Sequence, residues 1–314
     1  MSVIIATRDG KSGGPLLTVQ CSRCGLGRVD PFPSAGETDQ WYADHYRRSY
    51  KGAAEPSLRH VLRAARNALM RWEWLNQQQL VLPWKDTYRQ TRSLDIGASS
   101  GEFVALMHKV GIDAYGIEPN NAYAAYAKAN LHLKVLQGSL EHRLQDFEPE
   151  SFQLITMFHV LEHLVEPIQS LRLIAKHLAA CGILYIEVPN AARACSPNYM
   201  FFRAHVLYFT GLTLRQTLET AGLQILAFNA DSADNLAVVA GKLESSRAQI
   251  FEHRPDLVEA QRKRRWIPYF YKELINGRPF ERMRRQLSER RLAALYRDPL
   301  SLIKSIYTNV SAIR

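Results

Sequence analysis

The chain has 314 residues, of which 46% are hydrophobic, 22% charged and 10% aromatic. This composition is typical of globular proteins and excludes the disordered, collagen-like and coiled-coil classes. No apolar run approaches the roughly 18 residues that a membrane-spanning helix needs, and the N-terminus lacks the apolar stretch of a secretory signal. Four cysteines do not make a disulfide scaffold. We therefore expect a soluble protein in the reducing setting of the cytoplasm.

The net charge of +10 is concentrated at the end of the chain, because residues 244–314 hold 16 Lys/Arg against 8 Asp/Glu. Arginine-rich runs at 261–266 and 282–297 suit phosphate recognition, although a solvated helical face is the ordinary reading of such charge. Glu281, Glu289 and Asp298 interrupt the positive charge and argue against a nucleic-acid partner. A peripheral membrane contact through these basic helices stays open, as does the oligomeric state.

Glycine, proline and the alternation of apolar runs divide the chain into four regions. Residues 1–35 predict short strands and turns, residues 36–90 a helical cap with a helix over 58–82, and residues 244–314 a basic helical extension. Residues 91–243 alternate between strand-like and helix-like runs, which predicts βαβ units and a mostly parallel sheet. The expected strands are 93–97, 114–118, 134–137, 152–158, 182–188, 223–228 and 236–240. The expected helices are 102–110, 121–130, 167–178 and 213–221.

The sharpest pattern is a small-residue turn, Asp95-Ile-Gly-Ala-Ser-Ser-Gly101, between an expected strand and an expected helix. Small residues let the backbone approach a ligand, and the helix N-terminus offers N–H groups. Asp95 would repel a diphosphate but not a cationic amine. Glu118 ends the next strand, where a carboxylate can accept both hydroxyls of a ribose. Ligands of such sheets bind at the carboxyl ends of the strands.

Three interpretations of this turn compete. A dinucleotide site needs G-x-G-x-x-G, but counted from Gly97 the other two glycines would fall on Ser99 and Glu102. An ordinary tight turn is the second interpretation. The third is a resemblance to the D-x-G-x-G-x-G turn of class I S-adenosylmethionine-dependent methyltransferases, in which Asp95, Gly97 and Gly101 match and Ser99 replaces the middle glycine.

Further segments in correct order resemble the same family over about 91–243. They are 116–120 after the second strand, 137–141 after the third, H-V-L-E-H at 159–163 after the fourth, 183–190 and 205–209. The resemblance implies a three-layer α/β, Rossmann-like core with a seven-stranded, mostly parallel sheet and S-adenosylmethionine as cofactor. The cofactor-binding residues that it implies are Asp95, Gly97, Ala98, Ser99, Gly101, Phe103, Glu118, Pro119, Ser139, Leu140, Phe158 and His159.

Methyl transfer to a hydroxyl or carbon acid also needs a general base, and histidine is the commonest choice near neutral pH. His159, His163 and His205 are the candidates, and packing or helix capping is the alternative for each. We expect no metal: Glu162 and His163 lack a third acidic ligand fixed by the sequence. Cys21 and Cys24 resemble one knuckle of a degenerate zinc ribbon and are weak candidates, since tetrahedral zinc needs four ligands.

The resemblance implies a methyltransferase acting on a small or glycan-like acceptor, namely a sugar, a nucleotide sugar or a polysaccharide intermediate. The alternatives are O-methylation of a quinone or aromatic metabolite, methylation of RNA, and a non-catalytic binding or scaffold protein that retains the fold.

Overall fold

The computed structural model describes most of the chain. The described residues are 2–34, 36–37, 55–81, 90–192, 201–229, 234–242, 257, 274–275 and 278–310. The chain divides into two units, one of residues 1–38, 157–176 and 183–276, the other of residues 39–156, 177–182 and 277–314. In the described part of the chain, every helix is too short or too polar to cross a lipid bilayer.

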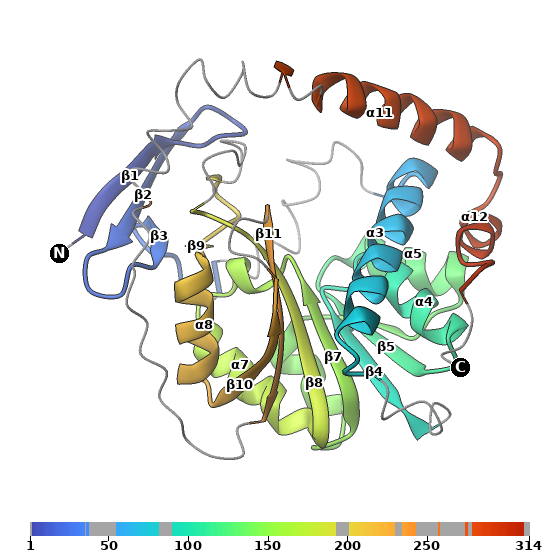
Figure 1. Cartoon of the computed structure of the whole chain (residues 1–314), viewed down its shortest axis with the longest axis horizontal. Coiled ribbons are helices and arrows are strands. Elements are labelled where there is room, and N and C mark those ends of the chain that lie inside the picture. Colours follow the sequence, from blue (N-terminus) through green and yellow to red (C-terminus); the bar gives the residue numbers. More distant parts are fainter. Residues whose placement is uncertain are drawn as a thin grey trace. The chain divides into compact units, whose positions relative to one another are not determined.

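Seven strands form one sheet in the order β10-β11-β8-β7-β4-β5-β6, which confirms the predicted α/β class (Figure 1). Their bounds are β4 (Arg92–Ile96), β5 (Asp113–Glu118), β6 (Val135–Gln137), β7 (Phe152–Phe158), β8 (Leu178–Pro189), β10 (Leu223–Phe228) and β11 (Asn235–Lys242). The pairs β4/β5 and β5/β6 are parallel, whereas β11 is antiparallel to both of its neighbours. The near-continuous apolar run of β7 is typical of a strand buried on both faces.

The second unit places helices against β4, β5 and β6. They are α3 (Leu58–Gln77), α4 (Glu102–Lys109) and α5 (Asn121–Leu131), followed by the short α6 (Leu140–Arg143). α4 packs on β4 and β5, α5 packs on β5 and β6, and α3 packs on α4. The predicted helix over 58–82 is wrong at its end, because α3 stops at Gln77 and Gln79 has the left-handed φ of 58°, which ends a helix.

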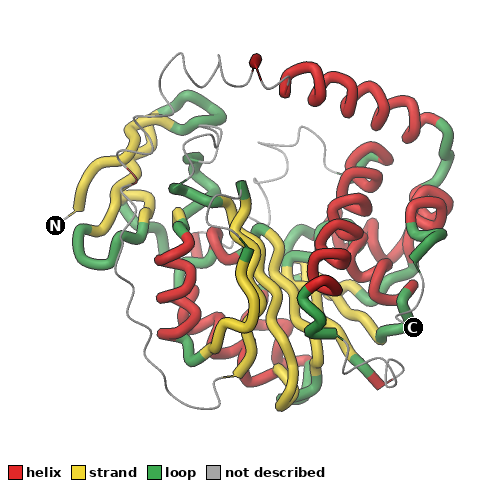
Figure 2. The backbone as a smooth tube through the Cα atoms, viewed as in Figure 1, coloured by secondary structure: helices red, strands yellow, loops and turns green. Residues whose placement is uncertain are grey.

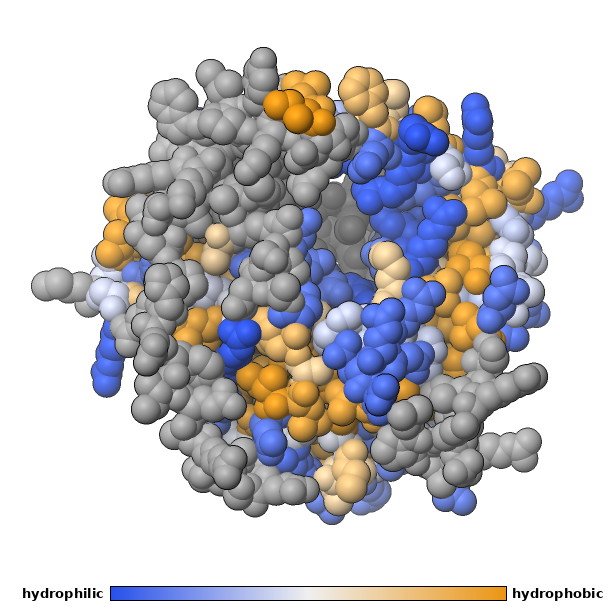
Figure 3. All heavy atoms as spheres, viewed as in Figure 1, coloured by the Kyte–Doolittle hydropathy of each residue, from blue (hydrophilic) through white to orange (hydrophobic). Residues whose placement is uncertain are grey.

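The C-terminal helices of the second unit are α11 (Arg278–Ala294) and α12 (Pro299–Ile306), and both contact α3. Glu289 of α11 is 2% exposed; its Oε2 lies 2.6 Å from Nη2 of Arg63 and 3.4 Å from Nε of Arg59. Burial raises the pKa of Glu289, but the hydrogen bonds and charges of these arginines outweigh it and lower that pKa. Figure 3 shows hydrophilic side chains gathered over α3 and α11. The predicted basic run at 261–266 lies outside the described residues, as do residues 38–54 of the predicted cap.

The first unit contains a separate four-stranded sheet with the order β1-β2-β3-β9 (Figure 2). Its strands are β1 (Ser2–Arg8), β2 (Pro15–Cys21), β3 (Gly27–Asp30) and β9 (Leu207–Tyr208), and all of its pairs are antiparallel. The same unit holds α7 (Pro167–His177), except for its last residue, which belongs to the second unit. It also holds α8 (Gly211–Thr220), which packs on β10. Thr210 and Thr213 form a capping box at the start of α8.

Candidate functional site

The turn after β4 has a left-handed backbone at three positions. Gly97, Ser99 and Gly101 have φ of 75°, 52° and 90°. Left-handed backbone is costly for residues with a Cβ atom, so glycine is the usual occupant. Ser99 keeps the conformation of the glycine that it replaces, which explains why the turn survives this departure from the pattern.

Two glycines make room for the side chains that pack against this turn. A Cβ built on Gly101 would lie 2.6 Å from Cδ1 of Leu133, and one built on Gly116 of β5 would lie 2.7 Å from Cβ of Ala98. Contacts this short force a neighbouring group to move. The amides of Gly97 and Ala98 both donate to the carbonyl of Ile117, at 2.8 and 2.9 Å, so the turn is held against β5.

Replacing Gly101 by alanine is expected to lower the free energy of unfolding by about 2–5 kcal/mol, since it combines a left-handed backbone cost with overpacking. Gly222→Ala is the matched control, because Gly222 has a similar φ of 85° but no atom within 4 Å of a built Cβ. The control is expected to cost only about 1–2 kcal/mol. Denaturant unfolding of both variants separates the two contributions; equal losses would contradict the steric explanation.

Glu118, at the end of β5, ties its carboxylate to the turn. The side chain is 3% exposed, and its Oε2 accepts from the amide of Ser99 at 2.8 Å while Oε1 accepts from the amide of Asn120 at 3.0 Å. The predicted turn and the predicted acidic residue are therefore in direct contact. A carboxylate offers about four lone-pair directions, so the same group can hold the turn and accept ribose hydroxyls.

Asp95 lies inside β4, opposite Gly116 of β5, and is 6% exposed. Its Oδ1 accepts a hydrogen bond of 2.7 Å from the hydroxyl of Thr156. Burial raises the pKa of Asp95 to about 7; the Thr156 hydrogen bond and Arg71 oppose this shift, and the charge of Glu118 adds to it. A cation beside Asp95 would favour the ionised form.

One residue near the turn was missed by the sequence analysis. His60, in the first turn of α3, places Nε2 3.5 Å from Oγ of Ser99, and its ring meets the ring of Tyr123 edge-on with centroids 5.5 Å apart. Sequence spacing gave no signal for it, since α3 reaches the turn only through tertiary packing.

The other predicted cofactor residues are divided between the two units. Ser139 caps α6 by accepting from the amide of His142 at 3.4 Å, and the carbonyl of Pro119 accepts from the side-chain amide of Gln137 at 3.2 Å. The second unit also holds three buried side chains, Ala98, Phe103 and Leu140. Phe158 and His159 belong to the first unit, where Phe158 packs edge-on against Tyr185.

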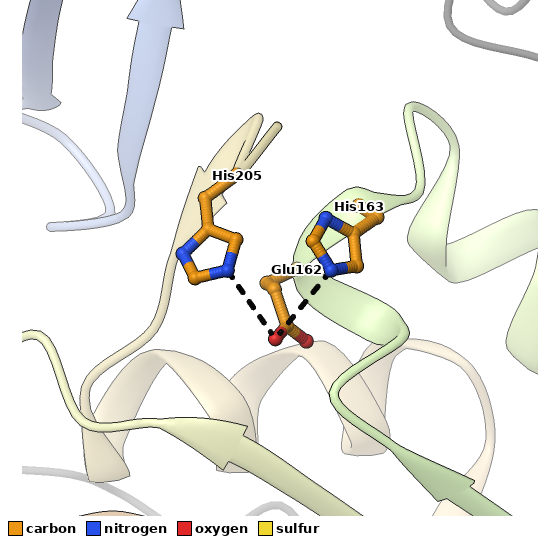
Figure 4. A group of neighbouring side chains, drawn as sticks. All are labelled: Glu162, His163 and His205. Carbon is orange, nitrogen blue, oxygen red and sulfur yellow. Dashed lines mark ion pairs between the residues drawn. The ribbon is translucent and has the colours of Figure 1, made fainter. Parts of the chain in front are cut away.

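The first unit contains a buried carboxylate that faces two imidazoles (Figure 4). Leu161–His163 form a 3-10 turn shortly after β7, and this turn buries Glu162 to 1% exposure. Oε1 of Glu162 lies 3.8 Å from Nε2 of His163 and 3.8 Å from Nε2 of His205. Burial raises the pKa of Glu162, but the charges of His163, His159 and His205 and a hydrogen bond to His159 lower it to about 2. The structure thus brings all three predicted bases together around one carboxylate, since Nδ1 of His159 also lies 3.4 Å from Oε1 of Glu162.

The tautomer of His163 follows from its surroundings. Nδ1 lies 2.7 Å from the carbonyl oxygen of Ala204, which only accepts, so Nδ1 carries the proton and Nε2 the lone pair of the neutral ring. Burial lowers the pKa of His163 and lowers that of His205 still further. Both rings are therefore neutral at pH 7.

His159 differs from the other two histidines. Its Nε2 lies 2.9 Å from Oε1 of Glu187, and its Nδ1 lies 3.4 Å from Oε1 of Glu162. Burial alone would lower the pKa of His159, but hydrogen bonds to these two carboxylates raise it to about 9. His159 is therefore mostly imidazolium at neutral pH and cannot accept a proton. His163 and His205 are the better candidates for the base.

Cys21 and Cys24 occupy the turn between β2 and β3 as free thiols. Within the described residues, they belong to no group of three or more His, Cys, Asp or Glu side chains able to hold a metal ion. The amide of Gly25 donates to the carbonyl of Cys21 at 2.9 Å, which closes the turn through the backbone.

Comparison with known proteins identifies the family of this chain. A family model described as "Methyltransferase domain" matches residues 47–227, more than half of the chain. Curated proteins give no significant match. Strands β1–β3 and helices α11 and α12 lie outside the matched residues.

Several solved structures are similar at low identity. A SAM dependent methyltransferase from Archaeoglobus fulgidus is 18% identical, with a TM-score of 0.43 over 55% of this chain and 94% of that one. A putative S-adenosylmethionine dependent methyltransferase from Listeria monocytogenes is 15% identical, with a TM-score of 0.43 over 55% and 98%. A chain in the complex between the Haloferax volcanii Trm112 methyltransferase activator and the putative methyltransferase is 17% identical, with a TM-score of 0.46 over 66% and 98%.

Proposed function

Since this chain belongs to the methyltransferase-domain family and its cofactor is S-adenosylmethionine, we propose that it methylates a hydroxyl of a small or glycan-like acceptor. The acceptor class that we favour is a sugar, free, nucleotide-linked or part of a polysaccharide intermediate. The observation that supports cofactor binding is the contact between Glu118 and the left-handed turn, because a buried carboxylate that could accept ribose hydroxyls lies against this turn.

We assign the cofactor to residues of the second unit. The ionised carboxylate of Asp95 takes the methionine ammonium group, and Gly97, Ser99 and Gly101 let the backbone pass close to the methionine part. Glu118 accepts the ribose hydroxyls, and Ser139 with Leu140 flanks the adenine. The residues fit the group, since Asp95 is a buried acid whose raised pKa a cation would reverse.

We assign deprotonation of the acceptor to His163 or His205, whose rings are neutral at pH 7. The imidazole takes the hydroxyl proton while the acceptor oxygen forms a bond to the methyl carbon. The bond from that carbon to the sulfonium sulfur breaks, and its electron pair stays on sulfur. The products are the methyl ether, the imidazolium and neutral S-adenosylhomocysteine, so charge and atoms balance. Alignment of oxygen, carbon and sulfur supplies much of the rate enhancement.

The test is S-adenosylhomocysteine formation by the full-length protein with three acceptor panels: sugars and nucleotide sugars, catechols and hydroquinones, and RNA. Turnover on the first panel supports the proposal, and turnover confined to either of the others overturns the acceptor class. Tight S-adenosylhomocysteine binding without turnover on any panel would favour the non-catalytic alternative. With an active acceptor, His163→Ala and His205→Ala are expected to lower kcat on the order of 100-fold. His142→Ala, at an exposed position on α6, is the control and is expected to keep the kcat of the parent protein.

A further inference from the structure

The carboxylate of Glu162 is buried and has few hydrogen bonds to compensate for the loss of water. The residue is 1% exposed, and apart from the 3.4 Å contact of Oε1 with Nδ1 of His159, neither of its oxygens has a hydrogen-bond partner in the described part of the chain. A buried carboxylate without donors is costly, and natural proteins satisfy such groups with hydrogen bonds, charges or metal ions. The imidazoles nearest to it approach at 3.4 to 3.8 Å, beyond good hydrogen-bond length.

From this arrangement we propose that Glu162, His163 and His205 bind one divalent transition-metal ion of the zinc class. One ligand atom from each residue lies within 4.8 Å of the other two. Ligands at 2.0–2.1 Å from tetrahedral zinc lie roughly 3.3 Å apart. The two Nε2 atoms are 3.8 Å from Oε1 of Glu162 and no more than 4.8 Å from each other, so side-chain movements of about 0.5 to 1.5 Å close the site around an ion.

The surroundings orient these ligands. The proton of His163 Nδ1 is donated to the carbonyl of Ala204, so the lone pair of Nε2 is directed toward Glu162. A backbone carbonyl in this role is the usual outer partner of a metal-bound imidazole. The ring of His205 packs 4.2 Å from the ring of Phe202 and 4.9 Å from the ring of His163, measured between centroids. Aromatic packing therefore holds the second imidazole in place.

The chemistry of the donors selects the ion. Two imidazole nitrogens with one carboxylate suit zinc and its neighbours, whereas Mg²⁺ and Ca²⁺ prefer all-oxygen sites. A set of three protein ligands leaves a fourth position for water or substrate, as in catalytic zinc sites. This inference departs from the sequence expectation of no metal.

The open position gives the ion a role that rests on the proposed function. An acceptor hydroxyl bound there would lose its proton more easily, because a zinc-bound oxygen acid has a much lower pKa than the free one. With an ion bound, the Nε2 lone pairs of His163 and His205 would be taken up by the metal, so the hydroxyl proton would pass to water, and the direct role of these histidines as base would belong to the metal-free protein. Binding of the ion itself does not depend on methyl transfer and can be measured without an acceptor.

The experiment is calorimetric titration of the chelator-treated full-length protein with Zn²⁺ and, separately, Mg²⁺, with Co²⁺ absorption as the spectroscopic probe. All titrations use the Cys21→Ser/Cys24→Ser double variant as background, because this neighbouring pair of thiols could bind zinc separately from the proposed site. We expect one Zn²⁺ per chain with micromolar or tighter Kd, the visible bands of four-coordinate Co²⁺, and no comparable Mg²⁺ binding. Glu162→Gln and His205→Ala in this background are each expected to weaken Zn²⁺ binding at least 100-fold.

His177→Ala is the matched control, because His177 is a buried histidine that belongs to no such ligand group among the described residues, and this variant is expected to keep full Zn²⁺ affinity. Thermal unfolding of each variant, followed by circular dichroism, checks that it is folded, and S-adenosylhomocysteine affinity is measured separately. Absence of saturable Zn²⁺ binding in folded protein, or binding that survives Glu162→Gln and His205→Ala, would overturn the metal site. Loss of S-adenosylhomocysteine binding in the parent protein would instead refute the proposed function, so the two failures are distinguishable.

Discussion

Glu118→Ala is expected to weaken S-adenosylmethionine binding by about 100-fold or more. The substitution removes two charge-assisted acceptors for the ribose, each contributing about 1.5–3 kcal/mol, and tenfold in affinity corresponds to about 1.4 kcal/mol. It also removes the acceptor of the Ser99 and Asn120 amides, so the turn itself loses its anchor. Isothermal titration with S-adenosylhomocysteine measures the effect.

Asp113→Ala is the matched control, because Asp113 is a carboxylate at the opposite end of the same strand. Its partner is Lys134, whose Nζ lies 2.7 Å from Oδ1, and both side chains are partly exposed. Exposed ion pairs contribute little, so this variant is expected to bind the ligand like the parent. Glu118→Gln keeps the side-chain volume and one acceptor and should give an intermediate Kd. Unchanged binding by folded Glu118→Ala would contradict the ribose assignment.

The second large effect concerns pH and Asp95. The carboxyl must be ionised to pair with the methionine ammonium group, and its pKa in the free protein is about 7. Below that value each unit of pH is expected to reduce S-adenosylhomocysteine affinity by up to about tenfold. Titrations between pH 5.5 and 7.5 should therefore show affinity rising with pH, and Asp95→Asn should bind weakly with no such slope.

The free energy of unfolding of the ligand-free protein is expected to fall as pH rises, whereas ligand affinity is expected to rise. The pKa of Asp95 is higher in the folded protein, about 7, than the ordinary value of 3.8. The folded state thus binds more protons between those values, and stability falls as pH rises through them. Relative to Asp95→Asn, the parent protein should lose thermal stability from pH 5 to pH 7.5. A parent and variant with parallel stability profiles would show that Asp95 is already ionised in the free protein.

Much of the fold could be predicted because its signals are local. The strands Phe152–Phe158 and Leu223–Phe228 have the predicted bounds, since each is an apolar run with polar or glycine residues at its ends. The small-residue turn and its acidic neighbours were also predictable, because the spacing from strand to helix is set by the βαβ unit. The left-handed φ of Ser99 was not, because serine has no intrinsic preference for that region.

The features that sequence could not give depend on contacts between distant segments. β9 is only two residues long, and its pairing with β3 makes it a strand. His205 was predicted as a candidate base, and only the fold brings it to the carboxylate of Glu162. His60 reaches Ser99 because α3 packs on α4, an arrangement that helical periodicity does not encode. Periodicity identifies which face of an element is buried but not what covers it.

The hydroxyl of Tyr307 donates to the carbonyl of Glu102 at 2.9 Å, in the first turn of α4, and the tyrosine is 1% exposed. Tyr307 follows α12 and lies outside the residues that match the family model, whereas Glu102 directly follows the left-handed turn. A recombinant fragment trimmed to residues 47–227 would remove the hydrogen bond to this carbonyl and the packing of α12 on α3 and α5. We therefore expect an isolated domain prepared from this chain to need the C-terminal helices for its stability.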